Sequence, residues 1–146
     1  MKKNDFGYEQ LTKSEHYKKV QNVFDNVAKE YDLMNDIMSL GLHRIWKKDF
    51  VNLIDIDNKK KINILDLAGG TGDIAKRILK KYPDVSVNII DKNFMMLKET
   101  FNEKSFVKEN NIKLICGDGE NIPLPDNSID IITLTFGVRN MTDRMK

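Results

Sequence analysis

The chain has 146 residues, which suits one domain with its own core, and no apolar stretch in it approaches the roughly 20 residues that cross a bilayer. Its 24 basic and 22 acidic residues are mixed along the sequence, so the net charge of +2 gives no electrostatic footprint for nucleic acid. Cys116 is the only cysteine, which excludes a disulfide framework, and its apolar neighbours predict a small buried side chain in a reducing compartment.

The first third of the chain is expected to be helical, because apolar side chains recur there at helical spacing. A helix is predicted over residues 17–31, with Thr12 and Glu15 placed before it as a capping box. A second helix is predicted over residues 42–54, and the less regular residues 32–41 separate the two. Core packing is the default explanation of both apolar stripes. They consist of Tyr17, Val20, Val23, Phe24, Val27, Ala28 and Tyr31, and of Leu42, Ile45, Trp46, Phe50, Leu53 and Ile54.

Aliphatic runs alternate with helical patterns in the rest of the chain. Strands that are buried on both faces are near-continuous aliphatic runs, so this alternation predicts an α/β fold with a parallel sheet. Right-handed crossovers then place the carboxyl ends of all strands at one edge, where a ligand would bind. The expected strands cover residues 62–67, 85–90, 112–116 and 129–134, and the expected helices carry Ile74–Leu79, ended by Tyr82-Pro83, and Phe94–Phe101.

The segment Ile64–Asp73, ILDLAGGTGD, is the most informative in the chain, because an apolar strand runs through an acid into a glycine-rich turn. Gly69, Gly70 and Gly72 have no Cβ, so their backbone can take positive φ and approach a bound ligand closely. A tight turn that merely joins strand to helix would explain any one of these glycines. Three within four positions predict a nucleotide-sized ligand site.

Two ligand classes fit this segment. The residues from Gly70 to Ala75 match the dinucleotide fingerprint, and Asp91 follows at the spacing of a ribose-binding acid, which keeps an NAD-binding oxidoreductase as an alternative. Asp66 favours the other class. A carboxylate at the end of the strand would repel a pyrophosphate, whereas it would attract the ammonium and sulfonium groups of S-adenosylmethionine.

Polar residues follow each predicted strand at the same edge of the sheet. An acid after the second strand, Asp91, can accept hydrogen bonds from ribose hydroxyls, and an acid after the third, Asp118, can accept one from an adenine amino group. An Asx turn before Gly119 is the simpler alternative for Asp118. The complete set is Thr71, Asp73, Asp91, Asp118, Gly119 and Thr135.

Four segments resemble the UbiE family of quinone-biosynthesis C-methyltransferases in order and spacing. They are the sequence YDLMNDIMSLGLHRIW from Tyr31 to Trp46, the run DLAGGTGD, the loop GDGENIPLPDNSID from Gly117 to Asp130, and TFGVRN from Thr135 to Asn140. The resemblance implies a Rossmann-like class I methyltransferase sheet. Residues 1–60 would form an N-terminal helical cap and substrate lid, and residues 61–146 an S-adenosylmethionine-binding core with the first four parallel strands. The family's later strands are absent from this chain.

By this resemblance the protein transfers a methyl group from S-adenosylmethionine to a ring carbon of a polyprenylated quinol in ubiquinone or menaquinone synthesis, without a metal. Arg139 and Asn140 match the family's substrate-side catalytic pair. Tyr31, in the lid, is the third catalytic candidate, although a core anchor would also explain it. Asp32, Asn35 and His43 share that segment, with helix capping or packing as plainer roles. The donor-binding set that the resemblance and the strand ends together give is Asp66, Gly70, Thr71, Gly72, Asp91, Asp118, Gly119 and Thr135.

The expected partner is a lipophilic polyprenyl quinol, and no nucleic acid is expected. A cytoplasmic location follows, with a peripheral contact at the inner membrane face or with a quinone-biosynthesis complex. The uncovered side of the fourth strand favours association into a homo-oligomer. A catalytically inactive, methyltransferase-like partner protein is a further alternative, because a fold does not fix a function.

Overall fold

A computed structural model describes most of the chain from Glu30 onward. Before that point it describes a short hairpin of β1 (Lys3–Phe6) and β2 (Glu9–Thr12), which pair antiparallel and which the sequence analysis did not predict. These polar four-residue strands carry no alternating apolar pattern. The described residues are 3–6, 9–12, 15, 18–19, 22–23, 30–57, 60–102, 111–137 and 141.

The predicted capping box is confirmed. The Thr12 amide donates to Glu15 Oε2 at 2.9 Å, and the Glu15 amide donates to Thr12 Oγ1 at 3.3 Å. The helix predicted over residues 17–31 lies largely outside the described residues. Those of its residues that the structure describes before Glu30 are helical, namely Lys18, Lys19, Asn22 and Val23.

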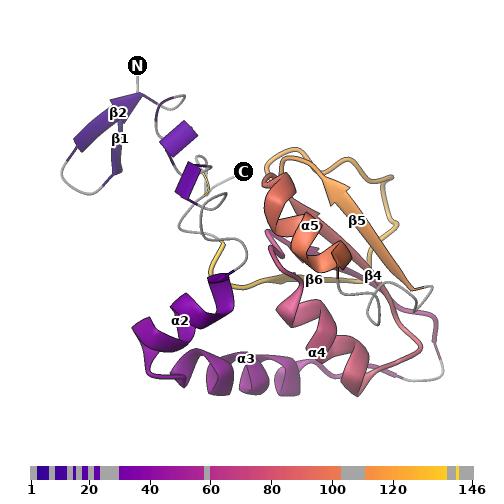
Figure 1. Ribbon diagram of the computed structural model, residues 1–146. Coiled ribbons are helices and arrows are strands. Elements are labelled where there is room, and N and C mark those ends of the chain that lie inside the picture. The colour runs from indigo at the N-terminus through magenta and orange to yellow at the C-terminus, as the bar shows by residue number, and fades with distance from the viewer. Residues whose placement is uncertain are drawn as a thin grey trace.

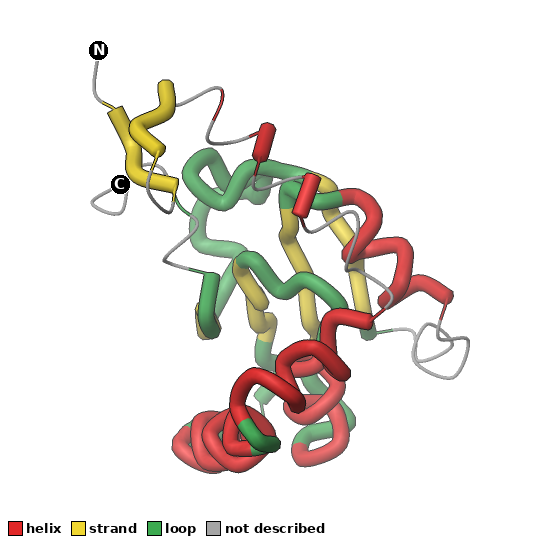
Figure 2. Tube along the Cα trace, turned by 60° about the vertical axis from the view of Figure 1, so that its left-hand side comes forward, coloured by secondary structure: helices red, strands yellow, loops and turns green. Residues whose placement is uncertain are grey.

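The four predicted strands form one parallel sheet in the order β5-β4-β3-β6, which confirms the α/β prediction (Figure 1). The strands lie side by side in the turned view of Figure 2 as well. Because β3 and β4 are central, their apolar side chains are almost completely buried, which explains their aliphatic sequences. The strands are β3 (Asn63–Leu67), β4 (Ser86–Asp91), β5 (Ile112–Cys116) and β6 (Ile131–Leu134).

The two faces of the sheet are covered differently. Three helices pack on one face, α3 (Leu42–Leu53), α4 (Asp73–Lys81) and α5 (Phe94–Asn102), and they bury a core that includes Ile64 and Ile78. The other face carries Leu65, Leu67 and Ile90, and in the part of the chain that the structure describes, loop residues pack against it. These residues are Leu124, Ile129 and Met141.

Residues 32–41, expected to be irregular, form helix α2 (Tyr31–Ser39), so that expectation is wrong. The helix ends where Leu40 and Gly41 take left-handed conformations, with φ of 50° and 78°. Periodicity did not predict this helix, because its apolar residues do not form a buried face. Leu33, Ile37 and Met38 are 58%, 69% and 77% exposed.

The apolar stripe predicted over residues 42–54 packs on the core only in part. Phe50 and Ile54 are partly buried against the core, whereas Leu42, Ile45, Trp46 and Leu53 are exposed. The buried residues of α3 are His43, Lys47 and Val51. Polar interactions at the interface with α2 and α4 therefore contribute to which side of α3 is buried.

Cys116 is also exposed, contrary to the predicted buried thiol. It is the last residue of β5, and β5 is an edge strand of the sheet. An apolar run at a sheet edge is covered less completely than one at its centre, which explains the difference.

Candidate functional site

The glycine loop connects β3 to α4, and the predicted positive φ is confirmed at two of its glycines but is wrong at Gly69. Gly70 and Gly72 have φ of 55° and 73°, in the region that favours glycine. Ala68 takes a φ of 52° as well, which the sequence did not indicate. Gly72 is the N-terminal cap of α4, so the loop leads directly into the first turn of that helix.

Gly69 allows the loop to approach the sheet closely. A Cβ at this position would lie 2.7 Å from Ile89 Cγ2 and 2.8 Å from Asp66 Oδ2. Both are closer than real Cβ contacts, and Ile89 is completely buried in β4. The loop is therefore pressed directly onto the sheet, where only glycine fits.

The amide groups of all three glycines are already used within the chain. Gly69 donates to the Ile90 carbonyl at 3.2 Å, and Gly72 donates to the Gly69 carbonyl at 2.9 Å. Gly70 donates to Asp91 Oδ2 at 2.9 Å. A loop with this pattern offers none of its glycine N–H groups to a phosphate.

Asp91 holds the loop from the end of β4. Its Oδ1 accepts a hydrogen bond from the Asn93 amide at 2.8 Å, while Oδ2 accepts the one from Gly70. Burial raises the pKa of this carboxyl, and the two backbone hydrogen bonds oppose that effect. The structure thus brings together two residues of the predicted set, Asp91 and Gly70.

Asp66 lies beneath the loop and not open at its surface, with only 1% of its surface exposed. Its Oδ1 accepts a hydrogen bond from Thr133 Oγ1 at 2.9 Å, whereas its buried Oδ2 has no partner. Burial raises the pKa of Asp66 to about 7, and the Thr133 hydrogen bond opposes the increase. Sequence reasoning missed Thr133, which comes from the neighbouring strand β6 in register with Asp66.

Thr135 follows β6 and carries the second unpartnered buried side-chain atom among the described residues, its Oγ1. Gly137, two residues on, lies against the glycine loop. A Cβ at Gly137 would be 2.5 Å from Ala68 Cβ, and Phe136 between them has a φ of 60°. Gly137 of the TFGVRN segment is thus packed on the loop, as the shared edge predicts.

Asp118 forms the Asx turn that was the simpler alternative. Its Oδ1 accepts a hydrogen bond from the Glu120 amide at 2.8 Å and pairs with Lys92 Nζ at 2.9 Å. An open cavity of about 420 Å³ is lined here by Lys92, Cys116, Gly117 and Asp118. Gly119 lies against Leu67 and Met141, where a Cβ would come within 3.1 Å of Leu67 Cδ1.

The other predicted site residues are placed less completely. Thr71 is buried in the loop, at 8% exposure. Tyr31 begins α2, but its side chain lies outside the described part of the structure, as do Arg139 and Asn140 altogether. Within the described residues, no group of three or more histidine, cysteine or acidic side chains could hold a metal ion.

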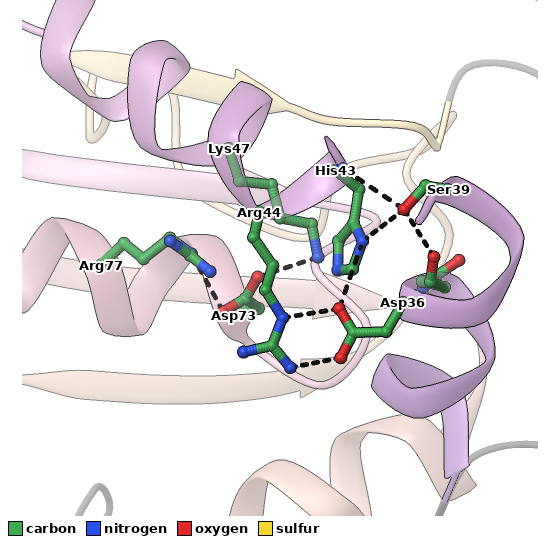
Figure 3. A network of polar contacts seen from close by, with 8 residues as sticks. Asp36, Ser39, His43, Arg44, Lys47, Asp73 and Arg77 are labelled. Carbon is green, nitrogen blue, oxygen red and sulfur yellow. Dashed lines mark hydrogen bonds and ion pairs between the residues drawn. The ribbon is translucent and has the colours of Figure 1, made fainter. Parts of the chain in front are cut away.

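A network of polar contacts joins α2 to α3, and sequence reasoning did not find it (Figure 3). Ser39 Oγ lies 2.8 Å from His43 Nδ1 and donates to the Asn35 carbonyl at 2.6 Å. Arg44 Nε donates to Asp36 Oδ1 at 2.6 Å, and a second guanidinium nitrogen pairs with Oδ2. His43 is buried in these contacts, which confirms the packing role.

The network continues from α3 to the start of α4 (Figure 3). Lys47 Nζ pairs with Asp73 Oδ2 at 2.8 Å, and Arg77 Nε pairs with Asp73 Oδ1 at 3.1 Å. Burial raises the pKa of Asp73, but the hydrogen bond and charge of Lys47, followed by the charge and hydrogen bond of Arg77, outweigh it and leave the pKa below its usual value. Only the Asp73–Arg77 pair, four residues apart on one helix, has a signal in the sequence.

A family model described as the ubiE/COQ5 methyltransferase family matches residues 11–146. The chain belongs to this family. The match extends from β2 across the glycine loop to the last residue, so it includes every predicted site residue.

Curated relatives of the ubiE/COQ5 chain agree with this assignment. It is 41% identical to the mitochondrial 2-methoxy-6-polyprenyl-1,4-benzoquinol methylase of Caenorhabditis elegans, covering 97% of this chain and 50% of the relative. It is 44% identical to the ubiquinone/menaquinone biosynthesis C-methyltransferase UbiE of Francisella tularensis subsp. novicida, covering 99% and 58%. The chain thus spans about half the length of the curated relatives that it matches.

Solved structures resemble the fold of this ubiE/COQ5 family member at lower identity. A methyltransferase of Aquifex aeolicus that depends on S-adenosylmethionine is 23% identical, with a TM-score of 0.52 over 58% of this chain and 46% of that one. The YcgJ protein of Bacillus subtilis is 21% identical, with a TM-score of 0.58 over 66% and 40%. The predicted Rossmann-like class I methyltransferase fold is confirmed. Among the described residues, the longest helices are too short or too polar to span a bilayer.

Proposed function

We propose that this chain binds S-adenosylmethionine and carries out C-methylation of a polyprenylated quinol ring in ubiquinone or menaquinone biosynthesis. The choice of donor rests on one observation, which is that the glycine amides of the loop are already hydrogen-bonded. All three are donated within the chain, and one of them binds the Asp91 carboxylate. A dinucleotide needs such amides for its pyrophosphate, whereas a sulfonium donor needs an acidic surrounding.

The residues present fit such a donor. The unpartnered Asp66 Oδ2 lies under the loop and supplies negative charge, and the unpartnered Thr135 Oγ1 is a hydrogen-bond donor that no atom of the described chain satisfies. Asp91, beside Gly70, has remaining lone pairs for ribose hydroxyls. S-adenosylmethionine supplies, when bound, an electrophilic methyl group. The chain's own contribution is to hold the acceptor carbon in line with that methyl and to exclude water.

Isothermal titration calorimetry tests the donor. We expect S-adenosylmethionine to bind at least about tenfold more tightly than NAD, because a carboxylate already occupies the Gly70 amide. Adenosine serves as the control ligand, since it lacks both the pyrophosphate and the sulfonium. Tighter binding of NAD than of S-adenosylmethionine would reject the proposal in favour of an oxidoreductase.

Arg139 and Asn140 are proposed as the substrate-side pair. Chain geometry supports this position, because Gly137 packs on Ala68 of the glycine loop and Met141 lies near Gly119. A guanidinium keeps its proton at physiological pH, and it therefore stabilises the quinol phenolate, or orders a water that accepts the proton, in place of acting as a base.

The Arg139→Ala variant is expected to lower kcat for methyl transfer by about 100-fold or more, the usual effect of removing one group that stabilises an oxyanion. Its affinity for S-adenosylmethionine should stay near that of the wild type. Radiolabelled methyl transfer and calorimetry measure the two quantities. The exposed Lys113→Ala variant is the control, and an equal loss of donor affinity and transfer in Arg139→Ala would contradict the role.

We also propose that the outward apolar side chains of α2 and α3 contact the membrane surface or the tail of the lipid substrate. Exposed apolar surface of this extent marks an interaction site. The polyprenyl chain named in the C. elegans relative supports a lipid partner. This apolar face consists of Leu33, Ile37, Met38, Leu40, Leu42, Ile45, Trp46 and Leu53.

Sedimentation with phosphatidylcholine vesicles tests the membrane contact with two matched isoleucines. Ile45 on the apolar face and Ile132 on β6 are 55% and 57% exposed. We expect Ile45→Ser to lower the partition coefficient about tenfold, since burying an isoleucine contributes about 1.5–3 kcal/mol, and Ile132→Ser to leave it unchanged. Equal partition of both variants and the wild type would count against the proposal.

A further inference from the structure

Lys47 is a buried cation at the point where the helical cap meets the glycine loop. Only 6% of its surface is exposed, and its Nζ lies 2.8 Å from Asp73 Oδ2 (Figure 3). Asp73 is the first residue of α4 and follows Gly72 directly. The Lys47–Asp73 pair therefore links α3 directly to the residue that follows the glycine loop.

The carboxylate of Asp73 has two cationic partners. Arg77 pairs with it from within α4, and Lys47 does more than Arg77 to hold its pKa below the usual value. Replacing a whole buried ion pair by apolar side chains is often neutral for stability, whereas removing one partner is destabilising. What Lys47 adds, and Arg77 does not, is a link between two elements.

A second contact fixes the other end of α3 to α4. Lys81 Nζ donates to the carbonyls of Val51, Asn52 and Ile54, at 3.2, 3.2 and 3.1 Å. The Asp36–Arg44 pair in turn joins α2 to α3. Because α3 is held at both ends, α2 and α3 follow the start of α4 as a unit.

We propose that Lys47 is a positioning residue through which donor binding at the glycine loop orders α2 and α3. The proposal rests on the proposed function, which places the donor at the loop and the acceptor near these helices. Donor binding restrains the loop and Asp73, and the Lys47–Asp73 pair passes that restraint to α3. The acceptor side is then held more firmly when a donor is present.

Hydrogen exchange on the purified protein, with and without S-adenosyl-L-homocysteine, tests this inference. In the wild type we expect slower exchange both in the loop, residues 69–73, and in α3. In Lys47→Met the loop should keep its protection while α3 loses it. Arg77→Met is the matched control, because it removes the other cation from the same carboxylate, and it should keep both protections.

Donor affinity gives a second measurement. Lys47→Met should raise the dissociation constant about fivefold or more, the usual range of coupling between sites, while Arg77→Met stays close to the wild type. If Lys47→Met does not fold, Lys47→Met/Asp73→Asn removes the buried carboxylate charge as well and is expected to show the same loss of protection in α3.

The outcomes separate the two proposals. Absent protection of the wild-type loop would overturn the proposed function and this inference with it. A protected loop with unchanged protection of α3 in Lys47→Met would overturn the inference alone. Equal losses in Lys47→Met and Arg77→Met would also overturn it, because the effect would then come from the charge of Asp73 and not from the link.

Discussion

Gly69→Ala is expected to lower the free energy of unfolding by about 1–3 kcal/mol and to abolish donor binding, since overpacking a buried site costs about this much. The added Cβ would meet Ile89 at 2.7 Å and the Asp66 carboxylate at 2.8 Å. Ile89 is a fully buried residue of the central strand β4, so it has no space to move into. The loop must lift from the sheet, which displaces the Gly70 amide that donates to Asp91.

Gly117→Ala is the matched control for stability, because the nearest atoms to a Cβ there would belong to Pro123, at 3.4 Å, and Ile115, at 3.7 Å. Neither glycine requires a left-handed conformation, so the comparison isolates the steric effect. Urea unfolding and calorimetry with S-adenosylmethionine measure stability and binding. Similar stabilities of the two variants, with donor binding retained in Gly69→Ala, would show that the loop is not pressed onto the sheet.

Asp66→Asn is expected to raise stability and to lower donor affinity at the same time. The pKa of Asp66 in the folded protein is about 7, above its ordinary value of 3.8. Between these two values the folded state holds a proton that the unfolded state has lost, so stability falls as the pH rises through this interval and is constant above it. The total contribution is about 4 kcal/mol.

The variant removes this titration, because an amide stays neutral. Asp66→Asn should equal the wild type near pH 4 and exceed it by a few kcal/mol near pH 8, according to unfolding curves measured at about pH 4, 6 and 8. The exposed Asp126→Asn variant should leave the pH dependence of the wild type unchanged. If the stability of the wild type does not fall between pH 4 and pH 8, the result would contradict a raised pKa of the buried Asp66 carboxyl.

Donor affinity should change in the opposite direction. A cation near the loop favours the ionised carboxylate, so S-adenosylmethionine should bind the wild type more tightly as the pH rises through about 7, with release of a proton. Asp66→Asn should bind it at least about tenfold more weakly at pH 8 and show no such pH dependence. Calorimetry in buffers with different ionisation enthalpies measures the proton release, and a gain of both stability and affinity would contradict the role of the charge.

The sheet was predictable from sequence because its central strands are buried on both faces and are therefore almost continuously aliphatic. The loop was predictable because glycine at positions 70 and 72 is the residue that positive φ favours. Helix α2 and the exposed part of the α3 stripe could not be predicted. Periodicity identifies an apolar face but not what covers it. Which side of α3 is buried depends on Lys47 and His43, whose partners come from other helices.

The polar partners of the site residues could not be predicted from the sequence either. Thr133 reaches Asp66 because β6 lies next to β3, a neighbour 67 residues distant in the chain. Asp118 was placed correctly at the sheet edge, but its carboxylate is engaged by Glu120 and Lys92. Sequence spacing shows where a strand ends. Whether the side chain there already accepts hydrogen bonds within the chain depends on the turn that follows.

The hydrogen bonding of the glycine amides within the chain affects how the turn interacts with inorganic phosphate and nucleotides, which are abundant in a cell. A strand-to-helix turn with free amides would be a general anion trap, and millimolar competitors would occupy it for much of the time. Here Ile90, Asp91 and Gly69 accept those hydrogens before any ligand arrives. Because none of these glycine amides is free to bind an anion, phosphate and nucleotides compete poorly with a cationic metabolite for this turn.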